Sequence, residues 1–415
     1  MRDSSLLLSF SLALITPATI LAQRDRPSVD GAITAGANLL IASQENYVPD
    51  APVPPMPDEK VPGWQESERE RLAKIRAESG SKAEWPYQGV YRIAPDGRIP
   101  PGYRVGGTAI VCNALCIDSK YSQNEAARQS VEHAIGFMLD ELESNEKLAP
   151  GPKEGYDVRG WAHTYALDFL LFAKRHDLLP EKYTERVEKM IPHLLECLAA
   201  NEVKGQGGWN YAGNSLSPFM TGSTLLALYQ AREMGYEFDH GMVERALDGL
   251  DAARTKTGSF IYSGTANGPV AMPGACARAA IAELCLFLAG RSDEMRLRNA
   301  VYAFFAHYED LLVRKSQQGT HVAPYGVAPY YFMYAHTYAA LAIEYLPRVD
   351  RQALRKKMQE TLWSTREADG GWNDRIFPRS KSYSTAMAML ALGAPRLDRI
   401  PEWKSVSAAA APEGK

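Results

Sequence analysis

Two kinds of helical pattern alternate along this chain. In the first kind, apolar residues recur every three or four positions and charged residues take the opposite face, as in YTERVEKMIPHLLECLAANE at 183–202. A helix with one charged face fits the outside of a fold, so these segments predict outer helices. Pro192 is expected to kink or interrupt the helix that contains it. The predicted outer helices cover 29–44, 123–143, 182–200, 239–254, 292–314 and 350–366.

The second kind of segment is rich in Ala, Leu and Ser and carries few charges, which is typical of a helix surrounded by protein. These segments begin at 106, 161, 221, 274, 334 and 383. They align without gaps on one anchor position, occupied by Gly107, His163, Ser223, Cys276, His336 and Ser384. The next residue is threonine in every segment except the fourth, which has Ala277. This self-similarity at one helical pair per repeat predicts an all-α fold, and closing the array into an α6/α6 toroid would bury every inner face.

The start of the chain resembles a leader sequence. MRDSSLLLSFSLALITPATILA has one arginine, an apolar run and a small final residue, which predicts a signal peptide over 1–22, cleaved after Ala22. The mature protein is therefore expected to be exported, periplasmic or extracellular, without stable membrane insertion. A single toroid domain is expected over 23–402, followed by a disordered tail over 403–415. A Pro-rich and charged arm at 47–104 interrupts the first repeat and is expected to act as a lid or a cover.

The charge of the chain limits its possible partners. The formal net charge is −3 and no Lys/Arg-rich tract occurs, so nucleic acid is not an expected partner. No polybasic membrane patch occurs either.

The number of cysteines is odd and their spacing shows no disulfide framework, so we expect them to be small buried side chains. They are Cys112, Cys116, Cys197, Cys276 and Cys285.

The order of an outer helix, a Gly-x-Trp loop and a small-residue inner helix resembles the prenyltransferase and squalene-cyclase repeat. GANLLIASQ at 36–44 matches the first part of the Gln-Trp motif of that repeat. LWSTREADGGW at 362–372 matches its end, with Arg366 where Gln is usual. The resemblance implies the terpenoid cyclase and protein prenyltransferase α/α toroid. By analogy, Trp209 and Trp372 in the similar GGWNY and GGWND stretches are expected to hold loops between outer helices.

The anchor position also carries the candidate chemistry. If the inner helices line a central cavity, the anchor side chains form a ring near its mouth. His163 and His336 both lie in an Ala-His-Thr-Tyr-Ala sequence, in opposite repeats, and are the candidate catalytic residues. The loops 205–214, 321–331 and 370–375 are expected to complete the mouth. The candidate ligand-binding residues are Arg159, Trp161, Asn210, Tyr211, Asn214, Arg278, Tyr325, Tyr330, Asn373 and Asp374.

The resemblance also raises the hypothesis of zinc. Protein prenyltransferase β subunits hold zinc with an Asp and a Cys on one inner helix and a His on the next. By this similarity, Cys276 and His336 match two of those ligands, but Gly274 occupies the position of the Asp. Two ligands do not make a stable zinc site, so a zinc-dependent transferase-like site stays an alternative.

Several functions remain open on sequence alone. The protonating cyclases of this fold need an Asp-x-Asp-Asp string, which this chain lacks. A polysaccharide lyase-like enzyme, using His, Tyr, Arg and Asn on an acidic polysaccharide, fits an exported toroid. A packing role for the His-Thr-Tyr segments is also consistent with the pattern. The sequence favours a toroid that binds a small-molecule, lipid-like or polysaccharide ligand without classical cyclase or prenyltransferase activity.

Overall fold

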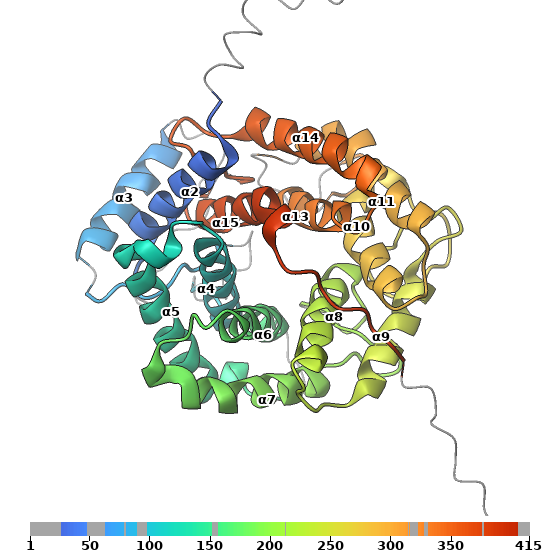
Figure 1. Cartoon of the computed structure of the whole chain (residues 1–415), viewed down its shortest axis with the longest axis horizontal. Helices are drawn as coiled ribbons and strands as arrows, with labels where there is room; N and C mark the ends of the chain where they lie inside the picture. The colour runs from blue at the N-terminus through green and yellow to red at the C-terminus, as the bar shows by residue number, and fades with distance from the viewer. Residues whose placement is uncertain are drawn as a thin grey trace, which may run out of the picture.

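The protein forms two concentric rings of α-helices (Figure 1). The computed structural model describes residues 26–47, 63–78, 80–88, 98–151, 157–211, 213–313, 315, 323–327, 331–375 and 377–405. The predicted signal peptide, the Pro-rich start of the arm and most of the predicted tail lie outside these residues. Within the described ranges the chain has two isolated β-bridges and no β-strand. None of the described helices is long and apolar enough to span a membrane.

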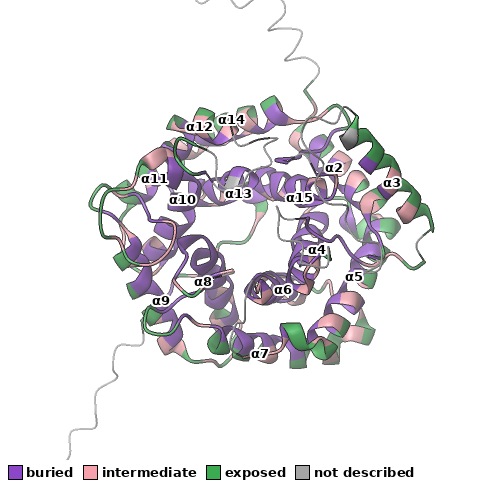
Figure 2. Cartoon of the chain, turned by 180° about the vertical axis from the view of Figure 1, so that it is seen from behind, coloured by how far each residue is buried: buried purple, intermediate pink, exposed green. Residues whose placement is uncertain are grey.

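Every helical pair predicted from the sequence is present. The outer ring contains α2 (Val29–Ser43), α5 (Glu125–Ser144), α7 (Thr184–Ala200), α9 (His240–Ala253), α11 (Glu294–Ala306), α12 (Tyr308–Leu312) and α14 (Arg348–Thr365). The inner ring contains α4 (Pro101–Cys116), α6 (Arg159–Arg175), α8 (Pro218–Glu233), α10 (Met272–Leu288), α13 (Tyr331–Ile343) and α15 (Ser380–Gly393). Each inner helix packs on the next, and α15 packs back on α4. The closed α6/α6 toroid is therefore confirmed, with exposed residues on the outward faces of the outer ring (Figure 2).

Two details of the helices differ from the prediction. Inner helices begin earlier than expected, for example at Pro101 and at Pro218, because proline is well tolerated at the first helical position. The helix around Pro192 is not interrupted, and α7 continues through it. Pro192 and Glu188 are both exposed, so the carbonyl group that loses its helical hydrogen bond can bind water instead.

Tryptophans in the loops fix the outer ring to the inner ring. The indole N–H groups donate to the last turns of the preceding outer helices: Trp85 to the carbonyl of Leu40 at 2.7 Å, Trp209 to Leu198 at 2.8 Å and Trp372 to Leu362 at 2.8 Å. The predicted role of Trp209 and Trp372 is thus confirmed. Trp85 belongs to the inserted arm, so the end of the arm supplies the loop of the first repeat.

A polar side chain near the start of the inner helices then holds the backbone of these loops. The contacts are Thr108 with the N–H of Trp85 at 2.9 Å, Thr221 with the N–H of Trp209 at 2.9 Å and Thr385 with the N–H of Trp372 at 3.1 Å. The gapless sequence alignment placed Thr224 at this position, and it was wrong by one helical turn. Residues three apart share a helix face, so a slip of one turn preserves the hydrophobic pattern.

The inserted arm and the end of the chain complete the fold. The charged segment of the arm forms α3 (Trp64–Glu78), beside α2 on the outside of the ring (Figures 1 and 2). After η4 (Ala394–Arg396), residues 397–403 form a C-terminal strap that crosses the open centre of the ring towards α8 and α9 (Figure 1). Trp403 is buried, and its indole donates to Glu244 at 2.8 Å. The packed domain therefore extends one residue past the predicted boundary at 402.

Candidate functional site

The first candidate catalytic residue, His163, lies between the two rings. Its side chain is fully buried. Nε2 lies 2.7 Å from the carbonyl oxygen of Leu148, and Nδ1 lies 3.0 Å from the side-chain amide of Asn201. His163 thus contacts the backbone of a segment that precedes its own inner helix, as the loop-holding threonines do in other repeats. Its catalytic role stays a prediction, but its contacts are those of a packing residue.

The second candidate, His336, is also fully buried. Nδ1 lies 2.7 Å from the carbonyl oxygen of Phe332, and the imidazole packs edge-on against the rings of Phe304 and Tyr308 from the outer ring. Nε2 has no hydrogen-bond partner. Burial lowers the pKa of His336 to about 4, against a small opposing effect of its hydrogen bond.

We expect His336 to make the protein acid-sensitive. The unfolded chain binds a proton near the ordinary histidine pKa of about 6.5, whereas the folded chain does so only near pH 4. The contribution of His336 to the free energy of unfolding is therefore fully present above about pH 6.5. It is lost as the pH falls towards 4, and the loss is about 2.5 kcal/mol at pH 4.5. Urea unfolding at pH 7.5 and 4.5 should show this difference, and His336→Leu should remove it. His133→Gln, which changes an exposed histidine, should leave it unchanged.

The residues proposed for zinc do not fit a zinc site. Burial raises the pKa of the Cys276 thiol to about 12, and its Sγ lies 3.4 Å from the carbonyl oxygen of Pro273. No group of three or more His, Cys, Asp and Glu side chains able to hold a metal occurs in the described part of the chain. Two ligands are fewer than the three that a catalytic zinc needs, so the zinc hypothesis stays a prediction that rests on the resemblance alone. The five cysteines are unpaired, and all but Cys116 are buried.

In the two Ala-His-Thr-Tyr-Ala copies, the threonines and tyrosines rather than the histidines face the centre of the ring. Tyr165 on α6 and Tyr338 on α13 meet across the axis, with their hydroxyl oxygens 3.3 Å apart. Thr164 and Thr337 lie beside them and line the same space. The repeated sequence therefore builds a contact between opposite sides of the inner ring.

Below this tyrosine pair lies a central cavity of about 110 Å³, lined by the C-terminal halves of the inner helices and by the C-terminal strap. Most of its lining is apolar, including Ile110, Phe172, Leu226, Leu341, Met387 and Leu390. Its main polar group is the carboxylate of Asp168. Asn113 of α4 donates to Asp168 Oδ2 and Gln230 of α8 donates to Oδ1, both at 2.9 Å.

Asp168 is electrostatically unusual. Burial raises its pKa, although the two amide hydrogen bonds oppose that rise. No cationic side chain of the described residues bonds to it: Arg175 at the cavity rim pairs with Glu233 at 2.5 Å. None of the predicted site residues lines this cavity. A signal for it was present, because Asp168 is a carboxylate inside the apolar segment YALDFLLF of an inner helix, where a charge needs a partner or a cavity.

The predicted ligand-binding residues gather at the opposite end of the ring, where the loops enter the inner helices. Several of their polar groups hold backbone instead of facing a cavity. Arg278 donates to the carbonyls of Phe260, Ile261 and Gly274, and Arg159 donates to that of Ala149. Asn210 and Asn373 stabilise the turns that contain them. Asn214 and Tyr325 are exposed, and Tyr330 lies outside the described residues.

Aromatic rings fill the centre of this loop end. Trp161 stacks on Tyr87 and on Phe219, with centroid distances of 6.1 and 5.7 Å. Tyr383 lies 4.5 Å from Tyr87 and 6.2 Å from Trp161, between ring centroids. Tyr211 meets Phe219 edge-on and exchanges a hydrogen bond of 2.6 Å with Tyr262. We call Tyr87, Trp161, Phe219 and Tyr383 the aromatic cluster.

Two donors of the aromatic cluster are unsatisfied. Trp161 and Tyr383 are 2% and 1% exposed, and Trp161 Nε1 and the Tyr383 hydroxyl have no hydrogen-bond partner. Native proteins rarely bury such groups alone, so both donors have the capacity to bind an oxygen acceptor. The sequence identified Trp161 but not Tyr383, which directly precedes the sixth anchor.

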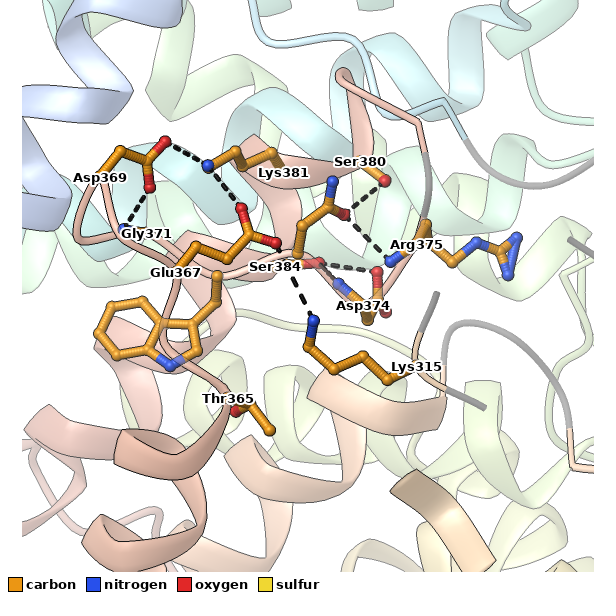
Figure 3. Close-up of polar contacts among 12 residues, drawn as sticks. Lys315, Thr365, Glu367, Asp369, Gly371, Asp374, Arg375, Ser380, Lys381 and Ser384 are labelled. Carbon is orange, nitrogen blue, oxygen red and sulfur yellow. Dashed lines mark hydrogen bonds and ion pairs between the residues drawn. The ribbon is translucent and has the colours of Figure 1, made fainter. Parts of the chain in front are cut away.

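The loop before α15 brings a carboxylate to this end (Figure 3). Asp374 is fully buried and accepts a hydrogen bond of 2.7 Å from the hydroxyl of Ser384. The loop is fixed from the other side by Lys381, which pairs with Glu367 and Asp369. Burial and the charges of nearby groups, Asp374 among them, raise the pKa of Tyr383. Asp374 therefore lies within electrostatic reach of the aromatic cluster.

Comparison with known proteins supports the fold. No protein-family model and no curated protein matches this chain. Among solved structures, the unsaturated glucuronyl hydrolase from Streptococcus agalactiae aligns with a TM-score of 0.51 and 11% identity, over 97% of this chain and 100% of that one. The alignment shows that the protein has an α/α toroid fold.

Two further solved structures align with lower TM-scores. The GH76A alpha-1,6-mannanase from Salegentibacter sp. HEL1_6 gives a TM-score of 0.48 and 12% identity, over 88% of this chain and 98% of that one. A possible GH105 member from Salmonella enterica serovar Paratyphi A gives 0.43 and 13%, over 94% and 99%. The expected membership of the prenyltransferase and squalene-cyclase superfamily is supported only as far as the related all-α toroid fold.

Proposed function

We propose that this protein is a carbohydrate-active toroid that binds a sugar at the loop end of the ring. The observation that carries the proposal is the pair of unpartnered donors, Trp161 Nε1 and the Tyr383 hydroxyl, inside a cluster of stacked aromatic rings. Sugars present many hydroxyl oxygens that accept such hydrogen bonds, and aromatic side chains supply the apolar contact that sugar rings need.

The chemistry of the reaction is proposed to centre on Asp374. It is a buried carboxylate beside the aromatic cluster and is therefore placed for general acid–base work. The matched toroid is named an unsaturated glucuronyl hydrolase, which makes an acidic, polysaccharide-derived sugar the first substrate class to test. Export is part of the proposal and rests on the leader sequence at 1–22 alone.

Tryptophan fluorescence titrations with oligosaccharides test the binding step. We expect saturable binding of an oligosaccharide bearing an unsaturated glucuronyl residue, with a neutral oligosaccharide as comparison. Tyr383→Phe removes one donor and keeps the ring, so the dissociation constant should rise about tenfold. Trp161→Phe should have a similar effect, measured by calorimetry because it removes a fluorophore. If both variants bind as tightly as the native protein, or if no oligosaccharide binds, the proposal fails.

Turnover is tested with two matched carboxylate variants from one loop. Release of new reducing ends should fall by at least about a hundredfold in Asp374→Asn, in line with the loss of a general acid. Asp369→Asn changes a half-exposed carboxylate of the same loop and should retain activity. Saturable binding without any turnover would instead support the ligand-binding toroid favoured by the sequence.

A further inference from the structure

The central cavity is separate from the proposed sugar site. It lies on the other side of the Tyr165–Tyr338 contact and opens between the C-terminal ends of the inner helices. The C-terminal strap passes over this opening, and Leu397, Asp398 and Ile400 of the strap contribute to the lining. Nothing in the proposed sugar chemistry uses Asp168 or the space beside it.

Asp168 has unused bonding capacity that faces this space. A carboxylate offers about four lone pairs, and the amides of Asn113 and Gln230 occupy one on each oxygen. The side chain remains partly accessible from the cavity. A purely structural link between α4, α6 and α8 would need no such access, and a neutral side chain would serve it without the cost of burying a charge.

The charges around Asp168 are already paired with one another. At the rim, Arg175 of α6 pairs with Glu233 of α8, and Asp398 of the strap lies 3.0 Å from Nε2 of His176. Tyr165 and Tyr338 form the roof, where burial keeps both phenols protonated by raising their pKa. Asp168 is thus a carboxylate of the described lining that bonds to no cationic side chain, while Arg175 in the same lining is paired elsewhere.

We propose that the central cavity binds a small organic cation, a protonated amine with an apolar body, whose ammonium group pairs with Asp168. The ammonium supplies both the charge and the N–H donors that the carboxylate lacks. Ile110, Leu226 and Leu341 contact the apolar body, and the two tyrosine rings favour a nearby positive charge. An engineered cavity of about 150 Å³ holds benzene, which has six non-hydrogen atoms, so this smaller cavity takes about four or five.

Calorimetric titration with isobutylammonium and with isobutanol tests the proposal, because the two probes match in size and differ in charge. At pH 7.5 the native protein should bind the ammonium at least about tenfold more tightly than the alcohol. Asp168→Asn should remove this preference and leave the binding of isobutanol unchanged. Leu341→Trp, which fills the cavity, should abolish the binding of both probes. Tyr383→Phe lies at the loop end and should change neither.

A second measurement needs no variant of Asp168. Burial raises the pKa of this carboxyl, and a bound ammonium favours its ionised form, so binding displaces a proton when the pH lies below that pKa. The affinity for isobutylammonium should therefore fall as the pH is lowered, while that for isobutanol stays constant. If the His176→Gln variant shows the same dependence on pH, the histidine at the rim of the cavity is excluded as the source of that dependence. Equal affinities for the two probes, a preference that survives in Asp168→Asn, or no binding of either probe would overturn the proposal.

Discussion

Replacing Arg379 by methionine is expected to lower the free energy of unfolding by about 3–5 kcal/mol. Arg379 donates from Nε and Nη2 to the two carboxylate oxygens of Glu45, each at 2.7 Å, and the two side chains are 4% and 1% exposed. The variant leaves Glu45 buried without its hydrogen-bonded cation. Because Glu45 follows α2 and Arg379 precedes α15, the pair joins the two ends of the ring. Urea unfolding followed by circular dichroism measures the loss.

An exposed ion pair of the same geometry provides the control. Arg186 donates to both oxygens of Glu143, at 3.0 and 2.7 Å, on the outer surface. Arg186→Met should cost less than about 1 kcal/mol, because solvent screens exposed pairs. The double variant Glu45→Leu/Arg379→Met should recover most of the lost stability, since it removes the unpaired charge as well. Similar losses in the two single arginine variants would contradict the role of burial.

Replacing Gly102 by alanine should destabilise the protein by about 3 kcal/mol, at the upper end of overpacking costs. A Cβ atom at this position would lie 2.3 Å from the carbonyl oxygen of Val158, which immediately precedes α6. One turn later, a Cβ at Gly106 would lie 2.1 Å from Cδ1 of Trp161. The two glycines let α4 approach the start of α6 closely. Since the first clash is with backbone, rotation of a side chain cannot relieve it.

Gly268→Ala is the matched control for this prediction. Gly268 is exposed, has no atom within 4 Å of the added Cβ, and does not have a positive φ. The substitution should be neutral or slightly stabilising, because it reduces the freedom of the unfolded chain. Thermal unfolding of the two variants beside the native protein makes the comparison. A Gly102→Ala variant as stable as Gly268→Ala would show that α4 and α6 can separate at little cost.

The fold was predictable because it follows from the hydrophobic pattern of the sequence. The outer helices show one apolar stripe, the inner helices are apolar all round, and their alternation gave the toroid and its helical pairs. The pattern could not give the register of the inner helices, since a slip of one turn leaves it unchanged. Thr224 therefore took the place of Thr221 in the sequence alignment, and His163 did not stand out as the counterpart of a loop-holding threonine.

The site was less accessible to sequence reasoning than the fold. Histidine drew attention because of its chemistry, but neither His163 nor His336 reaches the described cavity. The residues that do reach the centre, Tyr165 and Tyr338, directly follow the threonines of the repeated sequence. Which side of a helix faces the axis depends on three-dimensional packing, and a single sequence shows only which residues share a side. Asp168 could have been identified as a carboxylate in an apolar helix, but not its amide partners.

The contact between the Tyr165 and Tyr338 hydroxyls has a consequence for how the ring can be used. It divides the axis of the toroid into two compartments, so a molecule that enters from one end has no straight path to the other. A ligand under the strap and a sugar among the loop aromatics could be held at the same time. Ligands that bind at the two ends should then not compete with each other.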